Sequence, residues 1–143
     1  MLVTCLECGW IEAGNQVMCI RCGNGLQATR HDITSIGGLR IASADGRYAW
    51  LLPKATDITI GRQDPHGQFM VGVDLSIADA HIYGVGRKHA RLFVKDGRIW
   101  LEDLQSSNGS RIGGKVVWPE EPLPLYFGSI FHLGRMSLIF DVA

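Results

Sequence analysis

The stretch Asp-Leu-Gln-Ser-Ser-Asn-Gly-Ser, residues 103–110, decides how this chain folds and what it can bind. It lies between two runs in which apolar and polar residues alternate, as they do in half-buried strands. A second polar stretch, Gly-Val-Gly-Arg-Lys-His at residues 84–89, is expected to meet it, with Gly-Arg at residues 61–62 nearby. Together they offer hydroxyls, an amide, guanidinium groups and glycine-freed backbone N–H groups. This inventory suits an anion with several oxygens.

Outward from this stretch, the pattern is that of short strands. The clearest hairpin joins residues 89–94 to residues 99–103 around an Asp-Gly turn. A small hairpin with Gly-Gly at its tip follows at residues 111–116. The other expected strands cover residues 39–41, 48–52, 57–60, 73–75, 129–132 and 136–140. About eleven short strands without a convincing helix predict an all-β protein, a two-sheet β-sandwich.

Three segments are expected to be loops. Proline and glycine interrupt residues 63–72, residues 78–86 also form a loop, and the prolines within residues 119–124 predict a segment that does not pair.

Composition excludes several classes of protein. Lys+Arg and Asp+Glu both number 14, so the formal net charge is zero and bulk attraction to nucleic acid or anionic membranes is not expected. The sequence has no run of 18 apolar residues, so no membrane-inserted helix is expected. The first residues, Met-Leu-Val-Thr-Cys, lack the basic and apolar regions of a signal peptide. We therefore expect a cytoplasmic protein.

All four cysteines fall near the N-terminus, in the pattern C-x₂-C-x₁₀-C-x₂-C: Cys5, Cys8, Cys19 and Cys22. Two such turns can aim four thiolates at one point, and thiolate softness favours Zn²⁺. Two disulfides, or an iron site with the same ligands, are the alternatives, and the lack of a signal sequence disfavours disulfides. A four-thiolate site leaves no open position for water, so the predicted zinc is structural.

The cysteine segment resembles a zinc ribbon. We expect this module at residues 1–28, a linker at residues 29–38 and the sandwich at residues 39–143. Some zinc ribbons bind nucleic acid, but Arg21 and Arg30 are balanced here by Glu7 and Glu12, so no basic face exists. Protein docking or plain stability is the favoured role.

Residues 38–143 resemble a forkhead-associated (FHA) domain. The motifs that carry the resemblance occur in order: Ile-Thr-Ile-Gly-Arg at 58–62, Gly-Arg-Lys-His at 86–89, Leu-Glu-Asp-Leu-Gln-Ser-Ser-Asn-Gly-Ser at 101–110 followed by Ile-Gly-Gly at 112–114, and Tyr-Phe-Gly-Ser at 126–129 with His-Leu-Gly at 132–134. Members of the family fold as β-sandwiches and bind phosphothreonine peptides through loops at one end.

The resemblance implies roles for individual residues. Arg62 and Ser107 would donate hydrogen bonds to the phosphate, and Asn108 would fix its loop and present its amide to the peptide backbone. His89 resembles a structural residue whose ring holds the loops together. Gly109 would release the backbone at the turn.

Gly61 completes the Ile-Gly-Arg motif and is expected to support the site. Arg87 and Lys88 flank the site. They either add electrostatic attraction for the anion or are solvated loop charges, and the second interpretation is favoured for Lys88.

One departure matters most: the family has a serine where this chain has Gly86. The missing hydroxyl would remove a hydrogen bond to a charged partner, worth about 1.5–3 kcal/mol. Gly86 keeps its N–H and permits close backbone approach, so the site either binds phosphate more weakly or serves phosphate-independent docking. Ser110 for threonine and Ser129 for aspartate are smaller changes.

Two function classes follow, and an enzyme is not expected. The favoured one is a phosphothreonine-dependent adaptor, with the zinc ribbon, in bacterial Ser/Thr kinase signalling. The alternative is a scaffold or structural subunit that docks a fixed protein partner without phosphate. Residues 109–115 have the spacing of a Walker A loop, but Val116 follows where Ser or Thr would hold Mg²⁺, and a β-hairpin is predicted there.

Overall fold

The computed structural model describes residues 2–4, 11–13, 34–63 and 72–142. From residue 34 onward, the described chain forms eleven strands and one short 3-10 helix, η1 (Ser76–Ala78). The strands are β3 (Leu39–Ser43), β4 (Ala49–Leu51), β5 (Asp57–Gly61), β6 (Val73–Asp74), β7 (Lys88–Lys95), β8 (Arg98–Asp103), β9 (Ser110–Ile112), β10 (Lys115–Val117), β11 (Leu123–Pro124), β12 (Ile130–Leu133) and β13 (Met136–Val142). The predicted all-β fold is confirmed.

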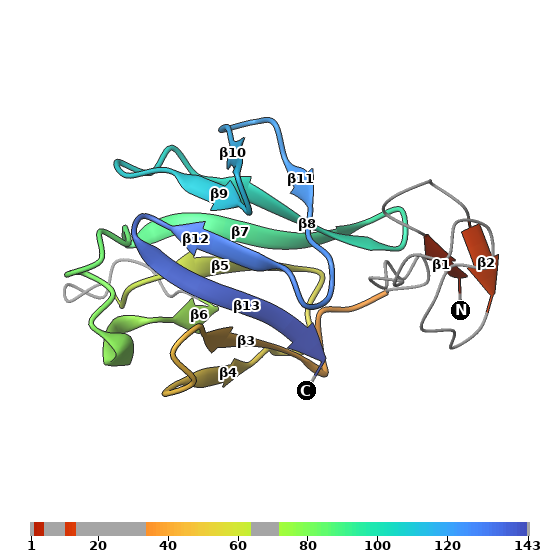
Figure 1. The fold of residues 1–143 in the computed structure, drawn as a ribbon, viewed down its shortest axis with the longest axis horizontal. Helices are drawn as coiled ribbons and strands as arrows, with labels where there is room; N and C mark the ends of the chain where they lie inside the picture. Colours follow the sequence, from red (N-terminus) through yellow and green to blue (C-terminus); the bar gives the residue numbers. More distant parts are fainter. Residues whose placement is uncertain (1, 5–10, 14–33, 64–71, 143) are drawn as a thin grey trace.

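The strands make two sheets that face each other (Figure 1). One sheet has six strands in the order β10-β9-β12-β13-β3-β4, and the other has five in the order β11-β8-β7-β5-β6. Every described pair in the two sheets is antiparallel except β5–β6. The chain crosses between the sheets after β4, β8, β10 and β11, so strands distant in sequence become neighbours and bring their loops together.

The core lies between the sheets and follows from the period of two along each strand. On β8, Ile99, Leu101 and Asp103 point inward while the residues between them are half-buried. From the other sheet, Phe131 and Phe140 are completely buried. A carboxylate at an inward position is costly unless hydrogen bonds satisfy it. Asp103 is therefore the first sign of a special polar arrangement at the end of β8.

The structure corrects three details of the sequence prediction. Pro124 lies in strand β11, which pairs with β8, although a non-pairing loop was expected. β11 is an edge strand, where a proline is tolerated because its missing N–H need not face a partner. The one described helical turn, η1, was missed because three residues give no readable periodicity. The parallel β5–β6 pair, Ile60 with Val73, was not foreseen either.

At the N-terminus, the described backbone is a two-stranded antiparallel ribbon. β1 (Leu2–Thr4) pairs with β2 (Ile11–Ala13), with Val3 opposite Glu12. The four cysteines lie outside the described residues.

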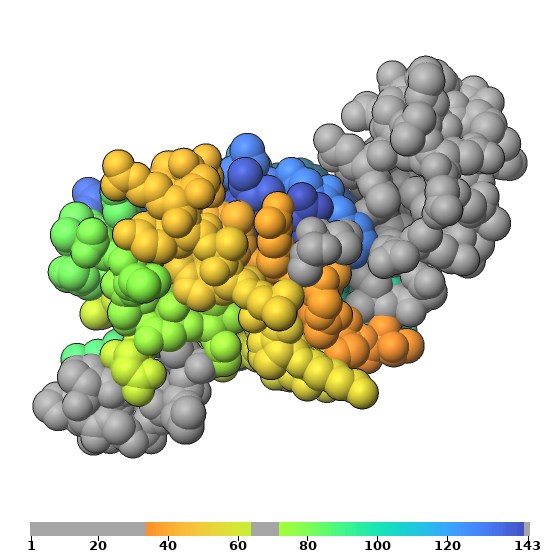
Figure 2. All heavy atoms as spheres, turned by 90° about the horizontal axis from the view of Figure 1, so that it is seen from below, coloured from red at the N-terminus to blue at the C-terminus, as the bar shows by residue number. Residues whose placement is uncertain are grey.

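Within the described residues, no helix is long and apolar enough to cross a membrane. Seen from below, the segment 34–63 fills the middle of one face and adjoins the green segment that contains η1 (Figure 2).

Candidate functional site

Three segments meet at one end of the sandwich: the end of β5, the loop of residues 84–88 that leads into β7, and the loop of residues 104–109 between β8 and β9 (Figure 1). The turn between β12 and β13 lies at the same end. Hydrogen bonds join all four, so segments that the sequence separates by up to about seventy positions form one cluster.

Arg62 is held at the end of β5 by the 84–88 loop. Its backbone N–H donates to the Arg87 carbonyl (3.1 Å), and its side-chain Nε donates to the Val85 carbonyl (2.6 Å). Gly61 makes this approach possible, because a Cβ there would overlap the Arg87 carbonyl oxygen. The terminal nitrogens of Arg62 make no hydrogen bond or ion pair with any described residue. The half-buried guanidinium thus has two terminal nitrogens that can donate to an anion.

Asp74 fixes the backbone that follows Arg62, through the N–H of Gln63. One carboxylate oxygen, Oδ1, accepts from the Gln63 N–H (3.0 Å), the Ser76 N–H (2.9 Å) and the Ser76 hydroxyl (2.5 Å). Partial burial raises the pKa of Asp74, but the hydrogen bonds from Ser76 and Gln63 outweigh it, so this pKa lies below its usual value. Sequence reasoning missed this residue; the Asp-x-Ser spacing at 74–76, typical of an Asx turn, was the available signal.

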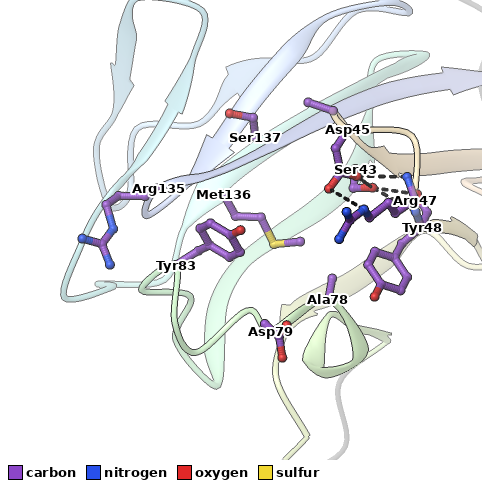
Figure 3. A pocket seen from close by; sticks show the side chains of 11 residues that line it. Ser43, Asp45, Arg47, Tyr48, Ala78, Asp79, Tyr83, Arg135, Met136 and Ser137 are labelled. Carbon is purple, nitrogen blue, oxygen red and sulfur yellow. Dashed lines mark hydrogen bonds and ion pairs between the residues drawn. The ribbon is translucent and has the colours of Figure 1, made fainter.

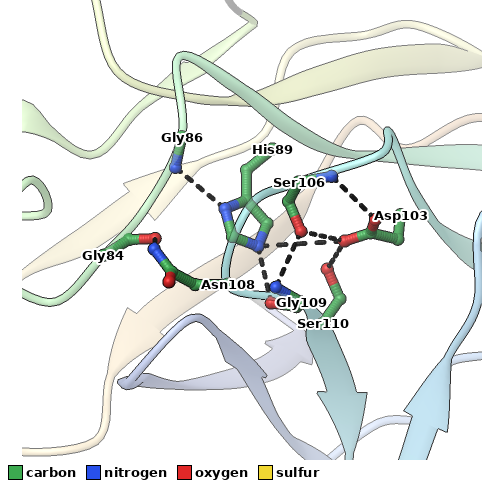
Figure 4. Close-up of polar contacts among 8 residues, drawn as sticks. All are labelled: Gly84, Gly86, His89, Asp103, Ser106, Asn108, Gly109 and Ser110. Atoms are coloured by element: carbon green, nitrogen blue, oxygen red, sulfur yellow. Dashed lines mark hydrogen bonds and ion pairs between the residues drawn. The ribbon is translucent and has the colours of Figure 1, made fainter.

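His89 joins the two main loops (Figure 4). Its ring is completely buried; Nδ1 accepts from the Gly86 N–H (2.9 Å), and Nε2 lies 2.8 Å from the Gly109 carbonyl. Since a carbonyl only accepts, Nε2 carries the proton and the ring is the neutral tautomer. Burial lowers the pKa of His89, against the opposing effects of the Gly109 carbonyl and the Asp103 carboxylate.

The loop of residues 104–109 is tied to Asp103, which is 3% exposed. Its carboxylate accepts from the Ser106 N–H (2.9 Å), the Ser106 hydroxyl (2.5 Å) and the buried Ser110 hydroxyl (2.5 Å). The Ser106 oxygen in turn accepts from the Gly109 N–H (2.9 Å). We call Asp103, Ser106 and Ser110 the Asp103 knot. Its members satisfy one another, which makes the loop rigid.

Asn108 links the loops from the outside. Its Nδ2 donates to the Gly84 carbonyl (2.9 Å), and a Cβ on Gly84 would lie only 2.8 Å from that nitrogen. Gly84 also has a positive φ of 81°, which favours glycine. The turn between β12 and β13 closes the cluster, since the Gly134 N–H donates to the Gly109 carbonyl (2.9 Å).

The predicted site residues divide by exposure. Ser107 and Arg87 are exposed, and their side chains make no hydrogen bond or ion pair with another described residue. His89 is inside, and Gly61 and Gly109 shape the backbone. Gly86 presents no side chain, and its N–H is directed to His89. An anion at this surface would meet donors from Arg62 and Ser107, while Gly86 can contribute only by sharing its N–H.

The four predicted metal ligands, Cys5, Cys8, Cys19 and Cys22, lie outside the described residues, so their predicted zinc site stays a prediction. The chemistry of the set, four thiols in two C-x₂-C pairs, fits Zn²⁺.

Comparison with known proteins gives a consistent result. The family model of the FHA domain matches residues 58–134, more than half of the chain. An FHA domain-containing protein of Arabidopsis thaliana is 32% identical over 73 residues, which are 51% of this chain and 18% of that protein. The chain thus corresponds to less than a fifth of this relative's length.

Solved structures share the fold. The FHA domain of an Arabidopsis thaliana hypothetical protein is 20% identical, with a TM-score of 0.58 over 92% of this chain and 94% of that one. The N-terminal FHA domain of Rad53p from S. cerevisiae, solved with a phosphothreonine peptide, is 19% identical, with a TM-score of 0.54 over 73% of this chain and 93% of that one.

Proposed function

Since the chain belongs to the FHA-domain family, we propose that it is a phosphothreonine-dependent adaptor that binds a phosphorylated segment of a protein partner. The phosphate would lie between the terminal nitrogens of Arg62 and the hydroxyl of Ser107. A phosphothreonine carries close to two negative charges and three acceptor oxygens, which match these donors. The Rad53p domain, whose structure holds a phosphothreonine peptide, supports the ligand class.

The observation that carries the proposal is the contrast between used and spare donors. Around the site, the polar groups of Asp103, Ser106, Ser110 and His89 hydrogen-bond to one another or to the backbone. Arg62 and Ser107 keep donors unused within the described residues, at the end of the sandwich where the loops meet. Such preorganised donors cost little ordering on binding.

The proposal is tested by titrating phosphothreonine peptides, selected from a degenerate library, and measuring their binding by fluorescence anisotropy. Each selected peptide is compared with its unphosphorylated twin. Arg62→Ala should weaken binding of the phosphorylated peptide at least about a hundred-fold, because it removes up to two charge-assisted hydrogen bonds. Arg40→Ala, an exposed arginine on β3, is the control and should bind as the wild type does. Equal affinity for peptide and twin would refute the proposal.

A second function remains a candidate because of Gly86. Gly86 has no hydroxyl, and its backbone N–H already donates to His89 Nδ1 (2.9 Å). A phosphate-independent scaffold or structural subunit would use the same loops as a fixed docking surface. A partner recovered by co-purification that stays bound after phosphatase treatment, and to the Arg62→Ala variant, would favour the scaffold over the adaptor.

The setting is also a proposal. The adaptor would serve Ser/Thr kinase signalling in a bacterial cytoplasm, with Cys5, Cys8, Cys19 and Cys22 holding one structural Zn²⁺. Four thiolates around one ion would supply the folding free energy that so short a segment lacks. Elemental analysis of the purified protein should find about one zinc per chain, whereas no metal together with four oxidised cysteines would contradict the ribbon.

A further inference from the structure

One edge of the six-stranded sheet is β10, which pairs only with β9 among the described strands (Figure 1). Two apolar side chains are exposed here: Val116 is 42% exposed, and Trp118, which directly follows the strand, is 60% exposed. Val117 between them is buried in the core, so Val116 and Trp118 lie on the outer face of the sheet. Neither residue belongs to the anion cluster described above, so this edge is a separate surface.

The hydrogen bonds of β9 show which backbone groups of β10 are free to pair. The Gly113 N–H, just after β9, donates to the Ile130 carbonyl (3.0 Å), so the backbone groups of residues 111 and 113 face β12. Those of residues 110 and 112 therefore face β10, where their partners are residues 117 and 115. Along β10 the direction alternates, so the N–H and C=O of Val116 face the open edge. An open edge of this kind can accept another strand.

The other edges of the sandwich are less suited to self-pairing. β6 and β11 are two residues long, and β11 contains a proline. β4 carries the exposed Leu51, but two basic residues, Arg47 and Lys54, flank it. The nearby Asp45 carboxylate is already engaged, since its Oδ1 accepts from the Ser43 hydroxyl (2.7 Å) and from the Arg47 N–H (2.9 Å) (Figure 3). Two β4 strands paired antiparallel would bring like charges together.

The charges that flank β10 have opposite signs. Lys115 begins the strand, and Glu120 and Glu121 follow shortly after its end. All three are exposed, and their side chains form no ion pair with any residue that the structure describes. If a second copy of β10 runs antiparallel, Lys115 of each copy lies beside the glutamates of the other, which is a favourable cross-strand arrangement. The formal net charge of the chain is zero, so two copies do not repel each other overall.

We propose that two copies of this chain pair antiparallel through their β10 edges, with Val116 of one copy opposite Val116 of the other. Each Val116 N–H then donates to the opposite Val116 carbonyl, and each Trp118 lies across from Gly114 of the other copy. Nothing described lies within 4 Å of where a Cβ on Gly114 would be, so the Trp118 indole has room to cover it. The contact is isologous, as in most symmetric dimers.

This pairing goes beyond the proposed function and does not depend on it. Because the two strands run in opposite directions, the ends of the two sandwiches that carry Arg62 and Ser107 face opposite ways. A dimer would therefore link two partner segments instead of holding one segment twice. The shared edge is short, so the association should be weak and depend on protein concentration.

Sedimentation velocity of the full chain, from about 5 to about 500 µM, tests the pairing in the range expected for so small an interface. The wild type should shift from monomer to dimer. Val116→Pro removes an edge N–H at a position where an edge strand tolerates proline, and it should weaken dimerisation at least about a hundred-fold. Leu51→Pro makes the same change on the opposite edge, β4, and should dimerise as the wild type does. A wild type that stays monomeric throughout, or equal losses in the two variants, would overturn the proposal.

Charge reversal gives a second test that leaves the strand intact. Lys115→Glu should weaken dimerisation about ten-fold, because each dimer contains the contact twice, and adding Glu120→Lys should restore it to within about two-fold. Amide hydrogen exchange by NMR should slow at Val116 as the concentration rises, and Leu51 should show no change. Failure of the double reversal to restore the dimer, or slowing at Leu51 in place of Val116, would also overturn the pairing. None of these outcomes bears on phosphothreonine binding, which the peptide titration tests separately.

Discussion

The two loops that face each other at the end of the sandwich are held by different means. The loop of residues 104–109 is tied by side chains, through the Asp103 knot, and so can present Ser107 outward. The loop of residues 84–88 is tied by its backbone: the Val85 carbonyl accepts from Arg62, and the Gly86 N–H donates to His89. Because these backbone groups already hydrogen-bond within the protein, the loop needs a side chain to bind a ligand. Gly86 has none, so on this side of the proposed site only Arg62, which the loop holds in place, brings a side-chain donor.

The largest effect should come from the Asp103 knot. Asp103→Ala removes the acceptor of the Ser106 and Ser110 donors, and the Ser110 hydroxyl is completely buried. The free energy of unfolding should fall by about 4 kcal/mol in urea denaturation. Asp57→Ala, which breaks an exposed contact with Arg91, is the control and should cost less than about 1 kcal/mol. Similar losses in the two variants would show that the knot does not hold the loop.

The next effect concerns His89, which belongs to both loops. His89→Gln should lower the free energy of unfolding by about 2 kcal/mol at pH 7.5, because at least one buried hydrogen bond is lost. It should also change the pH dependence. Burial places the pKa of folded His89 below its value in the unfolded chain, so the unfolded chain takes up the proton first as pH falls.

The wild-type protein should therefore keep the contribution of His89 above about pH 6.5 and lose it as the pH falls further towards the folded pKa. The pKa of His132 is lowered too, by burial and then by Arg111, so His132→Gln is the matched control. Urea denaturation at pH 7.5 and at pH 5 should show that His89→Gln removes the larger part of the acid-induced loss. If His132→Gln removes as much, the buried ring is not the main titrating group.

Neighbouring serines should separate structure from binding. Ser107→Ala should weaken phosphothreonine peptide binding about ten-fold and leave the free energy of unfolding within about 0.5 kcal/mol, because its side chain is exposed. Ser106→Ala should act mainly on stability and lower the free energy of unfolding by about 2 kcal/mol. The Ser106 hydroxyl both donates to Asp103 and accepts from the Gly109 N–H. Calorimetry with one peptide and urea denaturation of both variants give the comparison. Identical behaviour of the two serines would contradict the division of roles.

The smallest effect is a gain. Gly86→Ser should tighten binding of the phosphorylated peptide up to about ten-fold, because it restores a hydroxyl at residue 86. A Cβ there would lie 3.6 Å from His89 Nδ1, an ordinary contact, so the change fits. Gly84→Ser is the matched control: its positive φ and its closeness to Asn108 Nδ2 should weaken binding instead. If Gly86→Ser does not raise the affinity for the phosphorylated peptide, residue 86 does not face the phosphate.

The sequence predicted much of this fold because its signals are local. Alternating residues and the Asp-Gly turn predicted the β7–β8 hairpin, and the polar stretch at residues 103–110 predicted a loop between strands. Pairings distant in sequence, such as β5 with β6, depend on register between strands and left no local trace. Pro124 was misread because its tolerance depends on the edge position of β11, which only the sheet order reveals.

The site was predictable by residue type but not by the destination of each hydrogen bond. Arg62, Ser107 and Asn108 have recognisable chemistry and occur at informative spacings. That the Gly86 N–H turns inward to His89, or that Asp74 supports Gln63, depends on atoms placed within a few tenths of an ångström. Backbone donors are present at every residue except proline, so sequence alone cannot tell a spare one from a used one.

The central claim is that Arg62 and Ser107 bind a phosphate between them, and ³¹P NMR of a bound phosphothreonine peptide tests it most directly. Titration of a library-selected phosphopeptide with the full chain should shift and broaden the phosphate resonance, and Arg62→Ala should abolish the change. The account would be contradicted if the peptide binds while its ³¹P resonance stays at the free position, or if it shifts equally with Arg62→Ala.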